Sequence, residues 1–145
     1  MFSTSIFMNG RILPVNNYIT NKIITMQILK LHFDQQNNAI LLFTLFGKEL
    51  IDANKIVRIE ALSNYSKIYL SNGKSFVIAK VLRWFEDKLT CTKFIRVHRT
   101  HLINKSFMHS YSLHHGAKII LQNGEIISVS RRKEKSVLMD LHVAA

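Results

Sequence analysis

The stretch FIRVHRTHLINK, residues 94–105, gathers side chains that could do chemistry. It holds two histidines three residues apart, His98 and His101, together with Arg96, Arg99 and Lys105. These residue types suit a metal site, a catalytic base or a surface that binds phosphate. Zinc usually takes four ligands, and this stretch has no Asp, Glu or Cys to complete the two imidazoles. The arginines would also repel a metal cation, so His98 is expected to be a hydrogen-bonded structural histidine.

Catalytic patterns are missing from the rest of the sequence. It has no glycine-rich phosphate loop and no Cys or Ser motif with a base at a suitable spacing, and its carboxylates look dispersed. Cys91 is the only cysteine, which excludes a disulfide framework and a cysteine-based zinc site. We therefore expect no enzyme, no metal and no cofactor.

The charge of the chain indicates a polyanionic partner. The 145 residues carry a formal net charge of +11, with a pI near 10.1, and 48% of them are hydrophobic. Such a charge favours nucleic acid, an anionic membrane or an acidic protein. The longest apolar run is far shorter than the roughly 20 residues that cross a bilayer, and no charged region precedes the apolar residues of the N-terminus. A cytoplasmic location without a membrane partner is expected.

Hydrophobic patterning predicts a mainly β fold of antiparallel hairpins with two helices. Expected strands, from alternation or short apolar runs, cover residues 39–46, 49–52, 56–61, 65–70, 75–78, 94–97, 118–121 and 126–129. Gly47-Lys48, Asn72-Gly73 and Asn123-Gly124 are hairpin turn signals. One amphipathic helix is inserted at residues 79–89, a second closes the chain at 130–141, and residues 106–115 are expected to form a loop or short helix. Residues 1–39 are an extension of uncertain structure, with loop signals at Leu13-Pro14, a strand in the second half of 18–33 and a turn at 34–38. The domain proper covers 40–145.

The start of the last predicted helix breaks a local rule. Ser130 can cap it through its hydroxyl, yet Arg131, Arg132 and Lys133 follow. Cations in a first turn oppose the helix dipole, at a penalty of about 0.3–1 kcal/mol each. A phosphate bound at this helix start would reconcile the dipole with the arginines. The alternative is a solvated cationic face.

Several motifs, in order, resemble the LytTR DNA-binding domain. They are IVRIEA at 56–61, the polar Ser63-Asn64-Tyr65 loop, Asn72-Gly73, FEDKL at 85–89, FIRVHRT at 94–100, Ile103-Asn104, and LQNG at 121–124 with VSRR at 129–132. The resemblance covers roughly residues 40–142. It implies a mainly β domain that places loops into successive major grooves of double-stranded DNA and regulates transcription. Members often bind direct repeats as paired copies, which implies a homodimer on DNA. Many are output domains of bacterial response regulators, but 39 preceding residues are too few for a receiver domain.

The resemblance and the residue types together assign roles. Three segments are expected to read DNA: residues 64–67, the Arg99-Thr100 turn and the Arg131-Arg132 turn. Arg131 is the first candidate for a base contact, because its planar fork can pair with guanine, followed by Arg99 and by Ser66 or Tyr65. Phosphate contacts are expected from Lys67, Arg96, Lys105, Arg132 and Lys133. His98 is expected to brace its loop, with a phosphate contact as the alternative, and Asn104 to satisfy backbone groups. The complete set is Asn64, Tyr65, Ser66, Lys67, Arg96, His98, Arg99, Thr100, Lys105, Arg131, Arg132 and Lys133. The other candidate function is a protein-interaction or anti-regulator module that uses the same fold without specific DNA readout.

Overall fold

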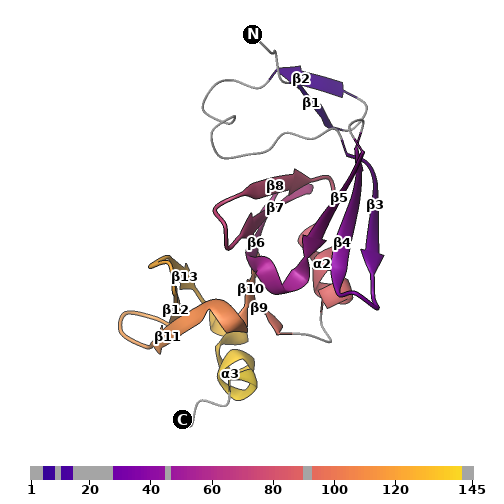
Figure 1. The fold of residues 1–145 in the computed structure, drawn as a ribbon. Coiled ribbons are helices and arrows are strands. Elements are labelled where there is room, and N and C mark those ends of the chain that lie inside the picture. Colours follow the sequence, from indigo (N-terminus) through magenta and orange to yellow (C-terminus); the bar gives the residue numbers. More distant parts are fainter. Residues whose placement is uncertain (1–4, 9–10, 15–27, 45–46, 90–92, 142–145) are drawn as a thin grey trace.

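Antiparallel sheets dominate the computed structural model, as the sequence predicts (Figure 1). It describes residues 5–8, 11–14, 28–44, 47–89 and 93–141. The first sheet contains β3 (Ile28–Asp34), β4 (Ala39–Thr44) and β5 (Gly47–Asp52). The central sheet has the order β8 (Ser75–Ile78), β7 (Tyr65–Leu70), β6 (Ile56–Leu62), β10 (His101–Asn104) and β9 (Phe94–His98). The third sheet contains β11 (Met108–Ser112), β12 (Lys118–Leu121) and β13 (Ile126–Ser128). A separate hairpin pairs β1 (Ser5–Met8) with β2 (Arg11–Pro14).

The central sheet is covered on both faces, because two cores meet at it (Figure 1). On one side it packs against the first sheet and helix α2 (Leu82–Leu89). On the other side it packs against the third sheet and helix α3 (Arg131–Asp140). Ile56 and Ile59 of β6 enter the first core and Val57 enters the second, which explains why β6 is buried along most of its length. Burial on both sides fixes the register of the strands, since a one-residue slip would exchange their faces.

The predicted Asn-Gly hairpins are confirmed. Gly73 has φ 86° between β7 and β8, and Gly124 has φ 88° between β12 and β13. Both angles lie in the left-handed region that glycine adopts without a steric penalty. The helix at the C-terminus and the strands at 65–70, 75–78 and 118–121 also form as expected.

Four local expectations were wrong. Residues 106–115 form the short 3₁₀ turn η2 (Lys105–Phe107) and the strand β11, because pairing with β12 supplies a ladder that local sequence does not announce. The inserted helix begins only at Leu82. Leu13 and Pro14, which were expected to lie in a loop, belong to β2. Gly47 and Lys48 lie inside β5, and the strand at 56–61 is preceded by the 3₁₀ turn η1 (Ala53–Lys55).

The expected boundary before residue 40 falls inside a hairpin. β3 pairs with β4 from Ile28↔Thr44 to Asp34↔Ala39, so residues 28–34 complete the first sheet. The Asp34 carboxylate accepts hydrogen bonds from the backbone N–H groups of Gln36 and Asn37, which closes the predicted turn. Within the described ranges, no helix has the length and apolar character needed to cross a membrane. Cys91 lies outside the described residues.

Candidate nucleic-acid interface

Three separate turns lie together at one end of the central sheet. The turn at residues 63–64 joins β6 to β7, the turn at 99–100 joins β9 to β10, and α3 starts after Ser130. The Ala61 N–H donates to the Thr100 carbonyl at 2.8 Å, and the Ser130 N–H donates to the Val97 carbonyl at 2.9 Å. The first bond ties the 63–64 turn to the 99–100 turn, and the second ties the start of α3 to β9 just before the 99–100 turn. We call residues 63–67, 99–100 and 130–133 together the three-turn edge.

The three-turn edge carries cations that are not neutralised. Arg99, Arg131 and Arg132 are exposed, and Lys133 is half-buried. Among the described residues, none of these four cations forms an ion pair. An anion that approached this edge would therefore meet positive charges that no carboxylate of the described residues neutralises.

The first turn presents polar groups from a tight backbone. Ser63 has φ 57°, a left-handed conformation that is uncommon outside glycine. Asn64 is exposed, while Tyr65 and Lys67 are half-buried. The Lys67 Nζ lies 4.7 Å from the centre of the Tyr69 ring, which holds this cation near the sheet.

Ser66 does not belong to the exposed set. Its side chain is fully buried, and its hydroxyl donates to the Lys80 carbonyl at 2.7 Å. Ser66 shares a face of β7 with the buried Ile68, as the period of two along a strand requires. The expectation that Ser66 reads a base is therefore wrong, and its hydroxyl instead ties β7 to the segment before α2.

Lys105 lies away from the three-turn edge. β10 starts at that edge with His101 and ends at Asn104, so Lys105 follows at the opposite end of the strand. Its Nζ is 3.3 Å from a carboxylate oxygen of Asp140, near the end of α3. Lys105, which was expected to contact phosphate, therefore lies outside the three-turn edge. A sequence separation of six residues hid the hairpin between Arg99 and Lys105.

Arg96 is occupied within the protein. Its guanidinium donates from Nε to the His98 carbonyl at 2.8 Å, from one terminal nitrogen to Glu86 at 2.8 Å, and from the other to the Arg99 carbonyl. Its side chain is only 18% exposed. The predicted role as a phosphate contact does not agree with this position.

His98 braces the second turn, as expected. Its Nδ1 lies 2.8 Å from the Thr100 hydroxyl and accepts the Thr100 backbone N–H at 3.2 Å. The rings of His98 and His101 lie 5.8 Å apart. Across the part of the chain that the structure describes, no group of three or more His, Cys, Asp or Glu side chains is placed to hold a metal.

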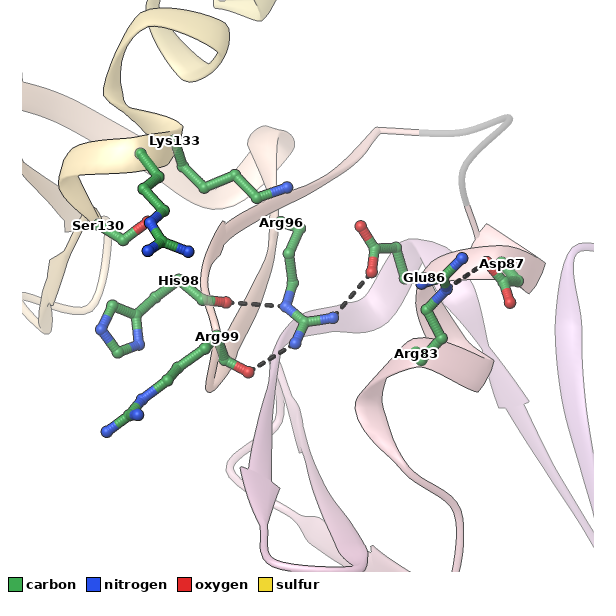
Figure 2. Close-up of a pocket in the computed structure, with 9 residues that line it drawn as sticks. Arg83, Glu86, Asp87, Arg96, His98, Arg99, Ser130 and Lys133 are labelled. Carbon is green, nitrogen blue, oxygen red and sulfur yellow. Dashed lines mark hydrogen bonds and ion pairs between the residues drawn. The ribbon is translucent and has the colours of Figure 1, made fainter.

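A cleft of about 950 Å³ runs beside β9, between α2 and the start of α3 (Figure 2). Arg132 and Lys133 of α3 and Arg99 line one side, and Arg83, Glu86 and Asp87 of α2 line the other. Arg83 and Glu86 were not predicted from the sequence to be parts of the site. Their position on the polar face of an amphipathic helix was visible, but the packing of that face beside β9 was not.

The start of α3 differs from the expected cap. Ser130 occupies the N-cap position with φ −69° and ψ 146°, but its side chain makes no capping hydrogen bond. The hydroxyl therefore leaves the first backbone N–H groups of α3 uncapped by a side chain. The Lys133 and Glu134 N–H groups donate to the Ser130 carbonyl.

A buried polar network supports the three-turn edge from the side of the third sheet. The Arg58 guanidinium is paired with Glu125 at 2.5 Å and Glu60 at 3.4 Å, and it stacks 3.8 Å from the centre of the Tyr69 ring. Burial, together with the hydrogen bond from its hydroxyl to Glu60, raises the pKa of Tyr69 to about 12. Burial alone would raise the pKa of Glu60, but the Tyr69 hydrogen bond and the charge of Arg58 outweigh it, so this pKa is lowered. Burial lowers the pKa of the neighbouring His101, which favours a neutral ring.

Asn104 has the structural role that the sequence indicates. Its side chain is fully buried; its amide donates to the Ile56 carbonyl at 2.9 Å and its oxygen accepts the Ser106 N–H at 3.0 Å. These bonds connect β10 to β6 and to η2. Asn104 therefore holds the central sheet together far from the three-turn edge.

Comparison with known proteins agrees with this architecture. The sequence model described as the LytTr DNA-binding domain matches residues 47–142. A solved LytTr DNA-binding domain from Bacillus cereus is similar in structure, with a TM-score of 0.62 and 21% sequence identity. The similarity covers 73% of this chain and 97% of that one. No curated protein matches the sequence.

Proposed function

Because the chain belongs to the LytTr DNA-binding domain family, we propose that it is a transcription regulator that reads specific sequences in double-stranded DNA. In this proposal the turns of the three-turn edge, rather than a recognition helix, enter successive major grooves. The protein acts in the cytoplasm and needs neither a metal nor a cofactor.

The observation that carries the proposal is the convergence of the three turns. Hydrogen bonds from Ala61 and Ser130 hold turns that are up to 68 residues apart in sequence on the same end of one sheet. The exposed cations on them, Arg99, Arg131 and Arg132, form no ion pair among the described residues. Basic side chains that converge from rigid elements suit a duplex, whose phosphates give affinity and whose base edges give specificity.

We also propose a division of roles among these side chains. Arg99 in the 99–100 turn and Arg131 at the first position of α3 are exposed, and their planar guanidinium groups suit bidentate contacts to guanine. Asn64, Tyr65 and Thr100 are the polar groups beside them that can contact base edges. Lys67, Arg132 and Lys133 suit phosphates, and Lys80 joins them because it is exposed at the same end of the central sheet. His98 acts through Thr100 by fixing the shape of the second turn.

The oligomeric arrangement on DNA forms part of the proposal. We propose that two copies bind a direct repeat. A module that only binds another protein is the competing function, and the exposed arginines at two of the three turns, Arg99, Arg131 and Arg132, favour DNA over it.

Selection from random duplexes tests the proposal. The full chain is incubated with a randomised duplex library at moderate salt, and bound duplexes are amplified and sequenced over several rounds. A motif that appears twice in the same orientation is the expected result. Arg131→Ala should relax one position of that motif, whereas Lys135→Ala, which removes the same charge one turn further along α3, should leave the motif intact. Recovery of duplexes without any enriched motif would contradict sequence-specific binding.

A further inference from the structure

We propose that Arg96 and Glu86 form a positioning pair that sets the conformation of the 99–100 turn and thereby the specificity of DNA readout. The inference rests on the proposed function. It assigns a role to two side chains that do not themselves reach the DNA, and it gives helix α2 a part in recognition.

The contacts of Arg96 all point to the turn or to α2. Its Nε donates to the His98 carbonyl, and one terminal nitrogen donates to the carbonyl of the next residue, Arg99 (Figure 2). The other terminal nitrogen donates to the Glu86 carboxylate. Three of the five N–H groups of the guanidinium, one on each nitrogen, therefore donate hydrogen bonds. A planar fork held at three points fixes both carbonyls relative to α2.

The turn needs this support because its ladder is irregular. The pairing of β9 with β10 shifts register between His101 and Leu102, next to the turn. A register shift leaves backbone groups without their regular cross-strand partners. Arg96 supplies donors to carbonyls at this point, and the half-buried ion pair with Glu86 keeps its guanidinium from rotating away.

The Arg99 side chain has no equivalent support of its own. It is exposed, and it forms no ion pair within the described ranges. A side chain that must reach a base edge loses affinity if its backbone must be ordered at the moment of binding. The Arg96–Glu86 pair orders that backbone before DNA arrives.

Removing the negative charge of Glu86 distinguishes positioning from simple electrostatics, because the two predict opposite changes in affinity for DNA. Glu86 is a carboxylate in a cleft beside the cations that face DNA, so electrostatics alone predicts that Glu86→Gln tightens binding to every duplex. Positioning predicts the opposite for the cognate duplex, because the anchor of Arg96 is weakened. Asp87→Asn is the matched control, since it removes the same charge from the next residue of α2, where the side chain is 62% exposed and pairs with Arg83.

The experiment measures the affinity of the full chain for a selected duplex and for a scrambled duplex. We expect Glu86→Gln and Arg96→Lys each to lose about 3–10-fold in affinity for the selected duplex, which is the scale of ordering a few side chains and a short turn. Affinity for the scrambled duplex should stay unchanged or rise. Asp87→Asn should bind both duplexes as tightly as the unaltered chain, or more tightly. The double variant should lose no more than Arg96→Lys alone, because both changes break one unit.

Arg96→Lys also separates positioning from a phosphate contact. Lysine keeps the positive charge, so a phosphate contact would survive and the preference for the selected duplex would persist. Loss of that preference with an unchanged salt slope supports positioning. Cognate binding by Glu86→Gln that equals or exceeds that of Asp87→Asn would overturn it.

Backbone amide exchange makes the inference independent of DNA. The Thr100 N–H donates to His98 inside the turn, and its exchange reports how firmly the turn is held. We expect faster exchange at Thr100 in Glu86→Gln than in Asp87→Asn, and a larger difference there than at amides in the centre of the central sheet, which report a change in global stability. Equal exchange at Thr100 in the two variants would refute the positioning pair, whatever the result with DNA. If the unaltered chain showed no preference for any duplex, that result would refute the proposed function but not the positioning pair.

Discussion

Replacing Arg58 with methionine should destabilise the protein far more than replacing Arg83, whose ion pair with Asp87 is exposed. The Arg58 side chain is 11% exposed and connects β6 with Glu125 in the β12–β13 turn, across the second core. Methionine has a similar length and would fill part of the same space. It would leave Glu60 and Glu125 without their cation and Tyr69 without its stacked guanidinium.

The magnitude follows from the exposure of the carboxylates. Breaking a fully buried ion pair costs about 3–5 kcal/mol, whereas an exposed pair contributes about 0–1 kcal/mol. The side chains of Glu60 and Glu125 are 29% and 38% exposed, so water can stabilise their charges in part. We therefore expect Arg58→Met to lower the free energy of unfolding by about 2–3 kcal/mol, between those limits. Arg83→Met, which breaks a pair whose side chains are 78% and 62% exposed, should cost at most about 0.5 kcal/mol.

The effect of Arg58→Met should shrink in acid. The folded state lowers the pKa of Glu60, so this group stabilises the protein above its unfolded pKa, near 4.5, and the stabilisation is lost as pH falls through the lower folded value. Arg58 provides part of that lowering. The difference between the unaltered chain and Arg58→Met is therefore largest at neutral pH and declines below about pH 4.5.

Urea unfolding followed by circular dichroism, at neutral pH and at several values below pH 4.5, measures both effects. The Arg83→Met variant is the control for loss of a surface arginine. A loss below about 1 kcal/mol at neutral pH would show that the network contributes no more than a surface pair. A loss that stayed constant into acid would refute the assignment of its pH dependence to Glu60.

Three further outcomes are expected. Affinity for duplex DNA should fall with a slope of log K against log salt between about −3.5 and −5.5, measured by fluorescence anisotropy, and a slope shallower than about −2 would contradict the interface. The steeper slope applies if all six cations of the interface neutralise phosphates, namely Lys67, Lys80, Arg99, Arg131, Arg132 and Lys133. The shallower slope applies if Arg99 and Arg131 contact bases, which leaves four cations on phosphates. Arg131→Ala should cost about 1–3 kcal/mol on the selected duplex, against a much smaller and sequence-independent loss for Lys135→Ala, and equal losses would remove its role in readout. Asn104→Ala should lower the free energy of unfolding by about 2–3 kcal/mol without changing DNA specificity, because the buried Ile56 carbonyl and Ser106 N–H lose their partner; a stability loss below about 0.5 kcal/mol would contradict that.

The parts of the fold that local chemistry decides were predictable. The Asn-Gly turns at Gly73 and Gly124 need left-handed backbone, and the sequence places glycine there. Strand β11 was not predictable, since its residues show no regular alternation of buried and exposed positions and its stability comes from pairing with β12. Whether a segment pairs depends on a partner elsewhere in the chain, which a local pattern does not contain.

The candidate site divides in the same way. Arg99 and Arg131 follow from recognisable motifs, and the structure exposes both. The burial of Ser66 could have been predicted from its place two residues before Ile68 on the same strand face. The contacts of Arg96 with Glu86 and of Arg58 with Glu125 could not, because they depend on how α2 and the third sheet pack against the central sheet.

The fold explains how α3 can begin with cations, although cations in the first turn of a helix are unfavourable. Arg131 and Arg132 repel the helix dipole, and Ser130 offers no side-chain cap to offset them. The bond from the Ser130 N–H to the Val97 carbonyl nevertheless fixes this helix start beside the 99–100 turn. Packing of Val137 in the second core stabilises the rest of the helix, so the unfavourable first turn is tolerated. A helix placed for core packing alone would gain from acidic residues at these positions. The first turn contains one acidic residue, Glu134, and the arginines at its start suit an anion supplied from outside the protein, as a DNA phosphate would be in the proposed function.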